Sequence, residues 1–262
     1  MKRLLILLLL LLPIAPLSAA DKTSTLKQLA EYSALRDQAR EIASFAVNEI
    51  ENRKKGLPEE EYQRLKNLIA QTFNEQRLYK AMYRHLEINY DANLSPRWLQ
   101  HLQSPLMRKI ADLEAQSAAS DNFPKLIAYA QQLQQQPAPE TRTTLINTLD
   151  EVTYTSELAV ESQLTVAKVL LHAINPSLPS NKQMSTSQIK AALDALRIQT
   201  TQNLQRFSLI THLYTYQSLN DKELQQYLAL YQSPEGAWAS DTIYQAIKAA
   251  LKDAIQRFQQ QA

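Results

Sequence analysis

The chain contains no cysteine and only two glycines, Gly56 and Gly236. Without cysteine there are no disulfide bonds, so the fold must be held together by its core alone. Thiol nucleophiles are excluded for the same reason. Two glycines leave little material for tight β-turns and none for a glycine-rich loop that cradles phosphate groups. The composition therefore argues against β-rich folds and against the common nucleotide-binding loops.

Long apolar runs are also scarce, and the clearest one lies at the start of the chain. Residues 4–12 are all aliphatic, Lys2 and Arg3 precede them, and small residues lead up to Ala20. Nine helical residues cover about 14 Å, whereas the hydrocarbon core of a bilayer is roughly 30 Å thick. This layout is typical of a secretory signal peptide. We expect residues 1–20 to be cleaved after Ala20, and the mature chain to be a soluble periplasmic or secreted protein without an integral membrane segment. The alternative is an uncleaved N-terminal anchor.

The charge balance gives no indication of a nucleic-acid partner. Of the 28 Lys and Arg residues, Lys2 and Arg3 lie in the predicted signal peptide, and the remaining 26 match the 26 Asp and Glu residues. Binding to nucleic acid or to an anionic membrane surface needs a concentrated basic surface. We therefore expect the mature chain to have no nucleic-acid partner.

What the sequence does contain favours helices. Alanine, leucine, glutamine, lysine and glutamate are abundant, and apolar residues recur at helical spacing, as at Ile42, Ala46 and Ile50. We predict an all-α fold, an antiparallel helical bundle. The first long helix is expected to end at Gly56 with a left-handed glycine cap, and the next to run unbroken over 58–86.

Pro137 and Pro139 cannot both lie inside a continuing helix. We place a boundary there between two helical modules, residues 21–136 and 140–262. In the second module the apolar spacing predicts one long helix over 145–174. Other helix starts are marked by side chains that accept hydrogen bonds from free amides, often followed by proline. These starts are Ser95-Pro96, Ser104-Pro105, Ser185 with Gln188, Asn220 with Glu223, and Ser233-Pro234.

The two modules share an order of features. A short predicted helix leads from Leu94 to Ser104 in the first module and from Leu219 to Ser233 in the second. The two copies are separated by 125 residues at the leucines and 129 at the serines, a difference of about one helical turn. We interpret this order as a degenerate internal duplication. The alternative is that Ser-Pro helix starts recur by chance.

The segment from Leu219 to Gly236 resembles the closing motif of an exported bacterial family known as domain of unknown function 2059. In that motif a capped short helix ends in an aromatic residue just before Ser-Pro-x-Gly. The matching positions are Leu219, Leu224, Leu228, Tyr231, Ser233, Pro234 and Gly236. The first module departs from the motif because Met107 stands in place of the glycine and one turn is missing before Ser104. The resemblance implies an all-helical periplasmic or secreted protein and supplies no catalytic residues.

The residue patterns of common catalytic and metal sites are absent. His85, His101, His172 and His212 include no His-Glu-x-x-His or other close ligand pair, and there is no Gly-x-Ser-x-Gly turn. We therefore predict no catalytic residue, no metal site and no cofactor. His85 and His212 precede the two short helices at comparable places, so a site shared between the modules is an alternative to purely structural histidines.

One group of ionisable side chains gives candidate binding residues. Asp150, Glu157, Glu161, Lys168 and His172 are spaced by seven and four residues in turn, so they share one stripe of the predicted long helix. Such a stripe is either an acidic, imidazole-bearing groove for a cation or basic peptide, or a solvated face opposite the apolar one. The pattern favours the solvated face.

Aromatic residues gather near the Ser-Pro motifs. They either line a binding groove or pack where short helices cross long ones, and the second interpretation is favoured. They are Tyr79, Tyr83, Tyr90, Tyr214, Tyr216, Tyr227, Tyr231 and Trp238.

Two functions are compatible with this sequence. The first is a non-enzymatic binding or structural protein of the bacterial envelope, with an envelope protein, peptide or cell-wall component as its partner. The alternative is an envelope hydrolase that uses Asp150, Glu157 or Glu161 together with His172.

Overall fold

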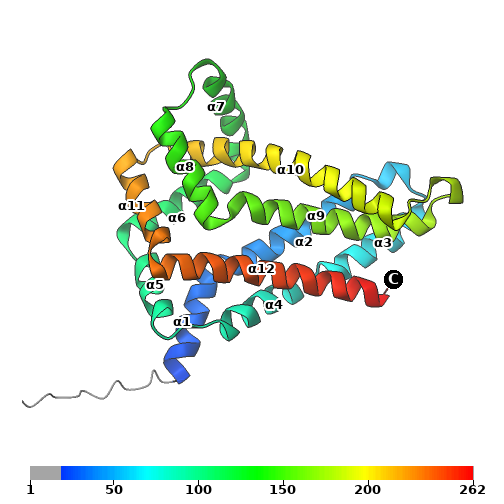
Figure 1. Cartoon of the computed structure of the whole chain (residues 1–262), viewed down its shortest axis with the longest axis horizontal. Coiled ribbons are helices and arrows are strands. Elements are labelled where there is room, and N and C mark those ends of the chain that lie inside the picture. Colours follow the sequence, from blue (N-terminus) through cyan, green and yellow to red (C-terminus); the bar gives the residue numbers. More distant parts are fainter. Residues whose placement is uncertain (1–18, 262) are drawn as a thin grey trace, which may run out of the picture.

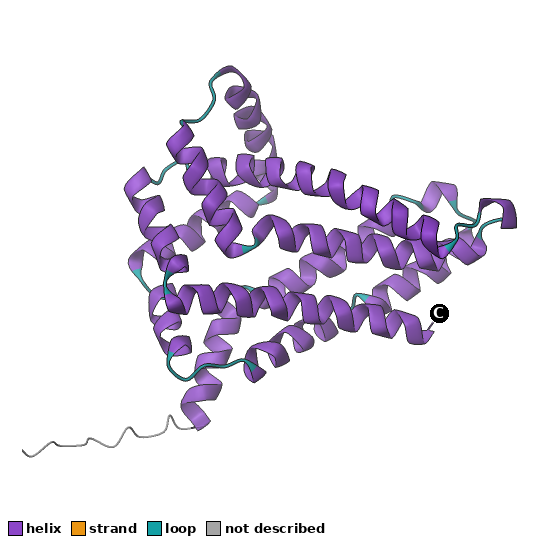
Figure 2. Ribbon diagram, in the orientation of Figure 1, coloured by secondary structure: helices purple, strands orange, loops and turns teal. Residues whose placement is uncertain are grey.

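All regular structure in the described part of the chain is helical (Figure 2). The computed structural model describes residues 19–261, and the predicted all-α helical bundle is confirmed there. Almost all of the predicted signal peptide lies outside the described residues. Within residues 19–261, no helix combines the length and apolar character needed to cross a membrane.

Seven helices precede the proline-containing linker and five follow it within the described range (Figure 1). The first half contains α1 (Ala19–Tyr32), α2 (Leu35–Glu51), α3 (Glu59–Thr72), α4 (Glu75–Ile88), α5 (Leu94–Leu102), α6 (Pro105–Ala118) and α7 (Phe123–Gln135). The second half contains α8 (Glu140–Thr153), α9 (Thr155–Ile174), α10 (Thr186–Thr215), α11 (Asp221–Gln232) and α12 (Pro234–Gln261).

The two halves share one hydrophobic core. The C-terminal helix α12 lies along α4 and also contacts α3 and α5, so a helix of the second half packs against the first (Figure 1). Leu65 and Met82 from the first half and Ala246 and Leu251 from the second belong to the same buried cluster. Burying one such aliphatic side chain contributes roughly 1.5–3 kcal/mol, and in the absence of disulfides this core holds the halves together.

The structure differs from the sequence predictions at three helix boundaries. The helix predicted over 58–86 is two helices, because the chain breaks at the buried Phe73 and Asn74 then caps α4 by accepting from the Arg77 amide at 3.1 Å. α2 ends at Glu51, and Gly56 closes a separate 3₁₀ turn without a positive φ, so the predicted left-handed glycine cap is wrong.

The third difference is a break in the helix predicted over 145–174. Tyr154 has φ 57°, in the left-handed region, and separates α8 from α9. A non-glycine residue in this region costs on the order of 1 kcal/mol, so its surroundings must hold it. The Tyr154 ring stacks on Tyr244 of α12 at 4.5 Å between centroids, and Asp150 accepts hydrogen bonds from the amide and hydroxyl of Ser156 at the start of α9.

An equivalent break occurs in the first half. Ala34, with φ 50°, separates α1 from α2, and Ala34 and Tyr154 are the only non-glycine residues with positive φ in the described chain. Each half thus opens with a helix pair bent at one left-handed residue and later has a short helix followed by a Ser-Pro start. The internal duplication itself stays a prediction.

Candidate ligand-binding cavity

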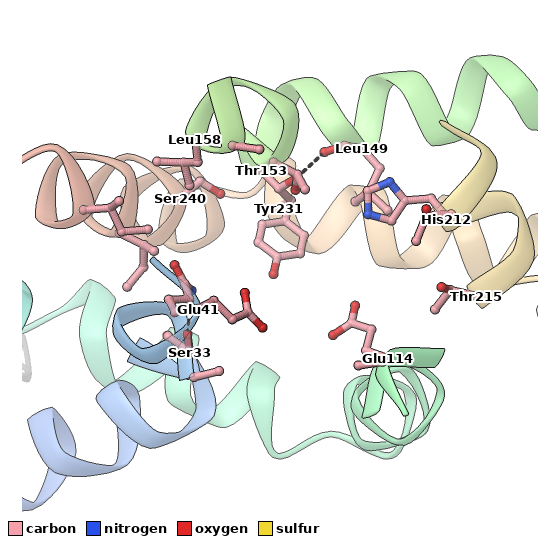
Figure 3. Close-up of a pocket in the computed structure, with 18 of the residues that line it drawn as sticks. Ser33, Glu41, Glu114, Leu149, Thr153, Leu158, His212, Thr215, Tyr231 and Ser240 are labelled. Atoms are coloured by element: carbon pink, nitrogen blue, oxygen red, sulfur yellow. Dashed lines mark hydrogen bonds between the residues drawn. The ribbon is translucent and has the colours of Figure 1, made fainter. Parts of the chain in front are cut away.

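A cavity of about 760 Å3 lies between the two halves of the bundle (Figure 3). Its walls come from α1, α2, α5 and α6 of the first half and from α8 to α12 of the second. Ser33 and Ala34 at the first left-handed break line it as well, as do Thr153 and Thr155 on either side of the second. The bends in the two helix pairs therefore help to shape this space.

One side of the cavity is a continuous row of rings, which we call the aromatic wall. It consists of Trp98, Tyr231, Tyr227, Tyr216 and His212, all of which line the cavity. Successive ring centroids are 5.1, 5.4, 5.8 and 5.6 Å apart. Two pairs in this row are spaced by four residues on α11 and α10, which places both rings of each pair on one helix face. Trp98 on α5 adds a ring from the first half.

Glu114 on α6 faces the aromatic wall across the half boundary. Its Oε1 accepts hydrogen bonds from the hydroxyls of Tyr216 at 2.6 Å and Tyr227 at 3.3 Å. Loss of hydration raises the pKa of the Glu114 carboxyl, and these two hydrogen bonds oppose part of the rise. Glu114 is nevertheless an exposed residue of the cavity lining, so solvent reaches part of its side chain.

Glu41 on α2 supplies a second carboxyl to the cavity (Figure 3). Desolvation is the main cause of its raised pKa, and the nearby charge of Asp37 adds to the rise. No hydrogen bond or ion pair of the Glu41 side chain occurs within residues 19–261. In contrast to Glu114, this carboxyl has no hydrogen-bond or ion-pair partner there, and because the residue is exposed, water solvates part of it.

His212 enters the cavity from α10 and belongs to a hydrogen-bonded chain. The Ser208 hydroxyl donates to Asp150 Oδ1 at 2.5 Å and lies 3.1 Å from His212 Nδ1. Because the single hydroxyl proton of Ser208 is used on Asp150, Nδ1 must carry the ring proton and donate to the serine oxygen. Burial lowers the pKa of His212, an effect that the charge of Asp150 partly opposes. The neutral ring thus keeps Nε2 as an acceptor.

Two hydroxyl groups of the cavity lining lack partners. The oxygens of Thr211 and Ser240 are buried and make no hydrogen bond, and the whole Ser240 residue is only 7% exposed. Buried polar atoms in proteins are almost always hydrogen-bonded. The lack of a partner for these two buried oxygens is therefore an unusual feature of the cavity lining.

The five candidate residues from the sequence do not converge on this cavity. Asp150 binds Ser156 and Ser208, Glu157 accepts a hydrogen bond from Tyr244, and Glu161 pairs with Arg197 at 2.7 Å. Lys168 is exposed, and His172 Nδ1 lies 2.8 Å from the Lys168 carbonyl oxygen. Asp150 lies on α8 and the other four on α9, so the break at Tyr154 interrupts the predicted stripe. None of the five lines the cavity.

The aromatic residues predicted near the Ser-Pro motifs divide into two groups. Tyr216, Tyr227 and Tyr231 line the cavity, whereas Tyr79 and Tyr83 pair with each other on α4 with ring centroids 6.0 Å apart. Among the histidines, His212 lines the cavity and His85 does not. His101 instead pairs with Glu235 of the second half at 2.8 Å.

The motif from Leu219 to Gly236 forms the junction of α11 and α12. Leu219 and Leu224 are each 2% exposed and belong to the core, and Ser233 caps α12 by accepting from the Gly236 amide at 3.1 Å. A Cβ on Gly236 would meet the Leu230 carbonyl oxygen at 2.0 Å, so the two helices approach too closely for any side chain there. Pro234 begins α12, while Tyr231 is the only member of this motif set that lines the cavity.

The sequence analysis missed both cavity carboxylates, although one left a signal. Glu114 follows Met107 and Ile110 at the spacing of a single helix face, and both of these residues are buried. An acidic residue in line with core positions is unusual and indicates a polar site inside the fold. The contacts of Glu114 with Tyr216 and Tyr227 span more than 100 residues and leave no local pattern.

Comparison of the chain with family models, curated proteins and solved structures finds no match. Over the described residues, no cluster of three or more histidine, aspartate or glutamate side chains is placed to hold a metal ion. Function must therefore be inferred from the cavity itself.

Proposed function

We propose that this chain is an exported, non-enzymatic binding protein of the bacterial envelope, and that its ligand occupies the cavity between the two halves. The observation that carries the proposal is the cavity with its convergent polar groups, Glu41, Glu114 and His212, beside an aromatic wall. Ligand sites in proteins are mostly 300–1,000 Å3 in volume and combine apolar or aromatic surface with a few polar groups. A volume of about 760 Å3 falls in this range.

The unpaired hydroxyls of Thr211 and Ser240 also support a ligand. Their burial without partners costs stability, as does the desolvation of Glu41 and Glu114. Natural proteins accept such costs mainly at functional sites. A binding role accounts for all four groups without requiring a catalytic step.

Export and family membership are parts of the same proposal. The basic, apolar and small-residue order of residues 1–20 supports export through a signal peptide. The resemblance of Leu219–Gly236 to the closing motif of domain of unknown function 2059 supports the same compartment. N-terminal sequencing of the protein recovered from a periplasmic fraction tests this point, and we expect Asp21 as the first residue.

Filling the cavity tests the binding proposal. Ala159 and Ser162 on α9 line the cavity, and Ala159→Phe or Ser162→Phe adds a ring inside it. We expect native mass spectrometry of protein purified from the periplasm to show a bound small molecule in the wild type and its loss in both variants.

Ala195→Phe is the matched control because Ala195 is an exposed residue of α10 that does not line the cavity. This variant should keep the bound molecule. Circular dichroism of all three variants checks that the helices are intact. Recovery of no bound molecule from the wild type, or equal recovery from cavity and control variants, would contradict the proposal.

A second candidate function is an envelope hydrolase, favoured by the two carboxyls with raised pKa values in one cavity. Glycosidases use one protonated carboxyl as an acid and a second as a base or nucleophile. For this candidate we propose Glu114 and Glu41 as the reacting carboxyls in place of Asp150, Glu157, Glu161 and His172, because both line the cavity. Release of reducing sugars from purified cell walls by the wild type, and its loss in Glu114→Gln, would establish hydrolysis instead of binding.

A further inference from the structure

The cavity has acidic groups without a matching positive charge. Glu41 and Glu114 are the only carboxyl groups among the described residues that line it, and no lysine or arginine lines it. The hydrogen-bond partners of Glu114 are two neutral tyrosine hydroxyls. Neutral His212 adds no positive charge. The lining thus offers these two carboxyl groups no cationic side chain as a partner, and a cationic ligand would supply the missing charge.

The two carboxyls come from separate parts of the lining. Glu41 projects from α2 and Glu114 from α6, and Figure 3 shows both pointing into the same space from separate ribbons, with Tyr231 above them. Two separate anionic groups match a molecule with two separate cationic ends. A single compact cation would compensate only one of them.

The surface that connects the two carboxyls is suited to alkyl chains and ammonium groups. The ring centroids of the aromatic wall are 5.1–5.8 Å apart, and Tyr216 and Tyr227 belong both to the wall and to the partners of Glu114. Methylene groups pack on aromatic rings, and ammonium groups are attracted to ring faces.

We propose that the cavity binds an organic dication, an α,ω-diamine or a longer polyamine, with one ammonium at Glu114, the other at Glu41 and the methylene chain against the aromatic wall. This inference rests on the proposed binding function and specifies the class of its ligand. Charge-assisted hydrogen bonds from an ammonium to a carboxylate are about twice as strong as neutral ones. Such a ligand would also give Glu41 a partner.

Other ligand classes fit the lining less well. An anionic ligand would meet two carboxylates and no basic side chain. A metal ion would find no third acidic or imidazole group close enough within the described residues. A neutral sugar would stack on the rings, but it would leave both carboxylates without a counter-charge.

Isothermal titration calorimetry of the full mature chain at pH 7.5 tests the proposal with three probes that share a five-carbon chain. These are 1,5-diaminopentane, 1-aminopentane and pentane-1,5-diol, with spermidine as a longer polyamine. We expect the diamine and spermidine to bind, the monoamine to bind at least about tenfold more weakly because one ion pair is lost, and the diol not to bind detectably. Glu41→Gln and Glu114→Gln should each weaken diamine binding by about tenfold or more.

Glu60→Gln is the matched control, because Glu60 is an exposed carboxylate in the first turn of α3 and lies outside the cavity lining. It should bind the diamine like the wild type. Equal binding of diamine and diol, or diamine binding unaffected by either cavity substitution, would overturn the dication inference. If no amine binds while a molecule recovered from the periplasm is lost in Ala159→Phe, the dication inference fails and the binding function stands. If that molecule is also absent, both fail.

Discussion

Burial shifts the pKa values of individual ionisable residues of the cavity, namely Glu41, Glu114 and His212. Glu114 was recognisable in principle, because it follows two core residues on one face of α6. His212 had been noted for its place before the second short helix, but its chain to Ser208 and Asp150 joins α10 to α8 over 58 residues. A contact between residues so far apart in the sequence depends on how the helices pack, so the spacing of residues could not predict it.

His212 should make the stability of the protein depend on pH. Its pKa is lowered in the fold, from an ordinary value of 6.5, so the unfolded chain binds more protons than the folded one between the lowered pKa and about 6.5. The free energy of unfolding should therefore fall as pH decreases through that window. Replacing the ring by His212→Gln should remove this part of the decline.

Urea denaturation at pH 7.5 and at lower values down to pH 5 measures this effect. The quantity to compare is the slope of the free energy of unfolding against pH in the wild type and in His212→Gln, since the substitution also shifts the absolute stability. Parallel pH profiles for the two proteins would show that His212 is not desolvated as described.

For individual helices, the local sequence predicted where a helix begins better than where a helix is interrupted. The capping boxes Ser185–Gln188 and Asn220–Glu223 are both present, and Ser104 and Ser233 cap their helices as predicted. The prediction for Ser95 is wrong. Asp91 instead accepts from the Leu94 amide, and the fully buried Ser95 hydroxyl accepts from the Asp91 amide. The break at Tyr154 was missed because its stacking partner, Tyr244, lies 90 residues away in α12.

The α11–α12 junction should depend on the absence of a side chain at residue 236. In an ordinary helix Gly→Ala adds roughly 0.5–1 kcal/mol of stability, but here the new Cβ would lie 2.0 Å from a backbone oxygen of α11. Since backbone atoms cannot move aside cheaply, we expect Gly236→Ala to lower the free energy of unfolding by about 1–3 kcal/mol.

The other glycine provides the control for this substitution. A Cβ on Gly56 would meet no atom within 4 Å, and its φ is not positive. Gly56→Ala should leave the stability unchanged or raise it by up to about 1 kcal/mol. Chemical denaturation compares the two variants directly, and an equal effect of both would show that close helix approach at Gly236 is not limiting.

For the whole molecule, the sequence predicted the class of fold and the place of the linker, but not how the halves meet. The prolines at 137 and 139 lie between α7 and α8 as predicted. The packing of α12 on α4 and the cavity between the halves depend on contacts between distant helix faces, and amphipathic patterns do not specify which faces meet. The break at Tyr154 divides the predicted stripe on 150–172 between α8 and α9, and its role in binding stays a prediction.

Because the halves share one core, we expect them to unfold together. Trp98 lies in the first half and Trp238 in the second, so Trp98→Phe and Trp238→Phe leave one fluorescent reporter in each half. The two variants should each show a fluorescence midpoint that coincides with the midpoint of helix loss by circular dichroism. Separate midpoints within one variant would indicate that the halves are independent domains.

The account depends most on two claims about Glu114: that its carboxyl is partly desolvated, and that it pairs with a cationic ligand. A carbon-13 NMR titration of the carboxyl signals, with the Glu114→Gln variant to assign the resonance, measures its pKa directly. We predict a pKa above the ordinary glutamate value of 4.5 in the free protein and a decrease when 1,5-diaminopentane is added to saturation. An ordinary pKa in the free protein, or one that does not respond to the diamine, would contradict the account.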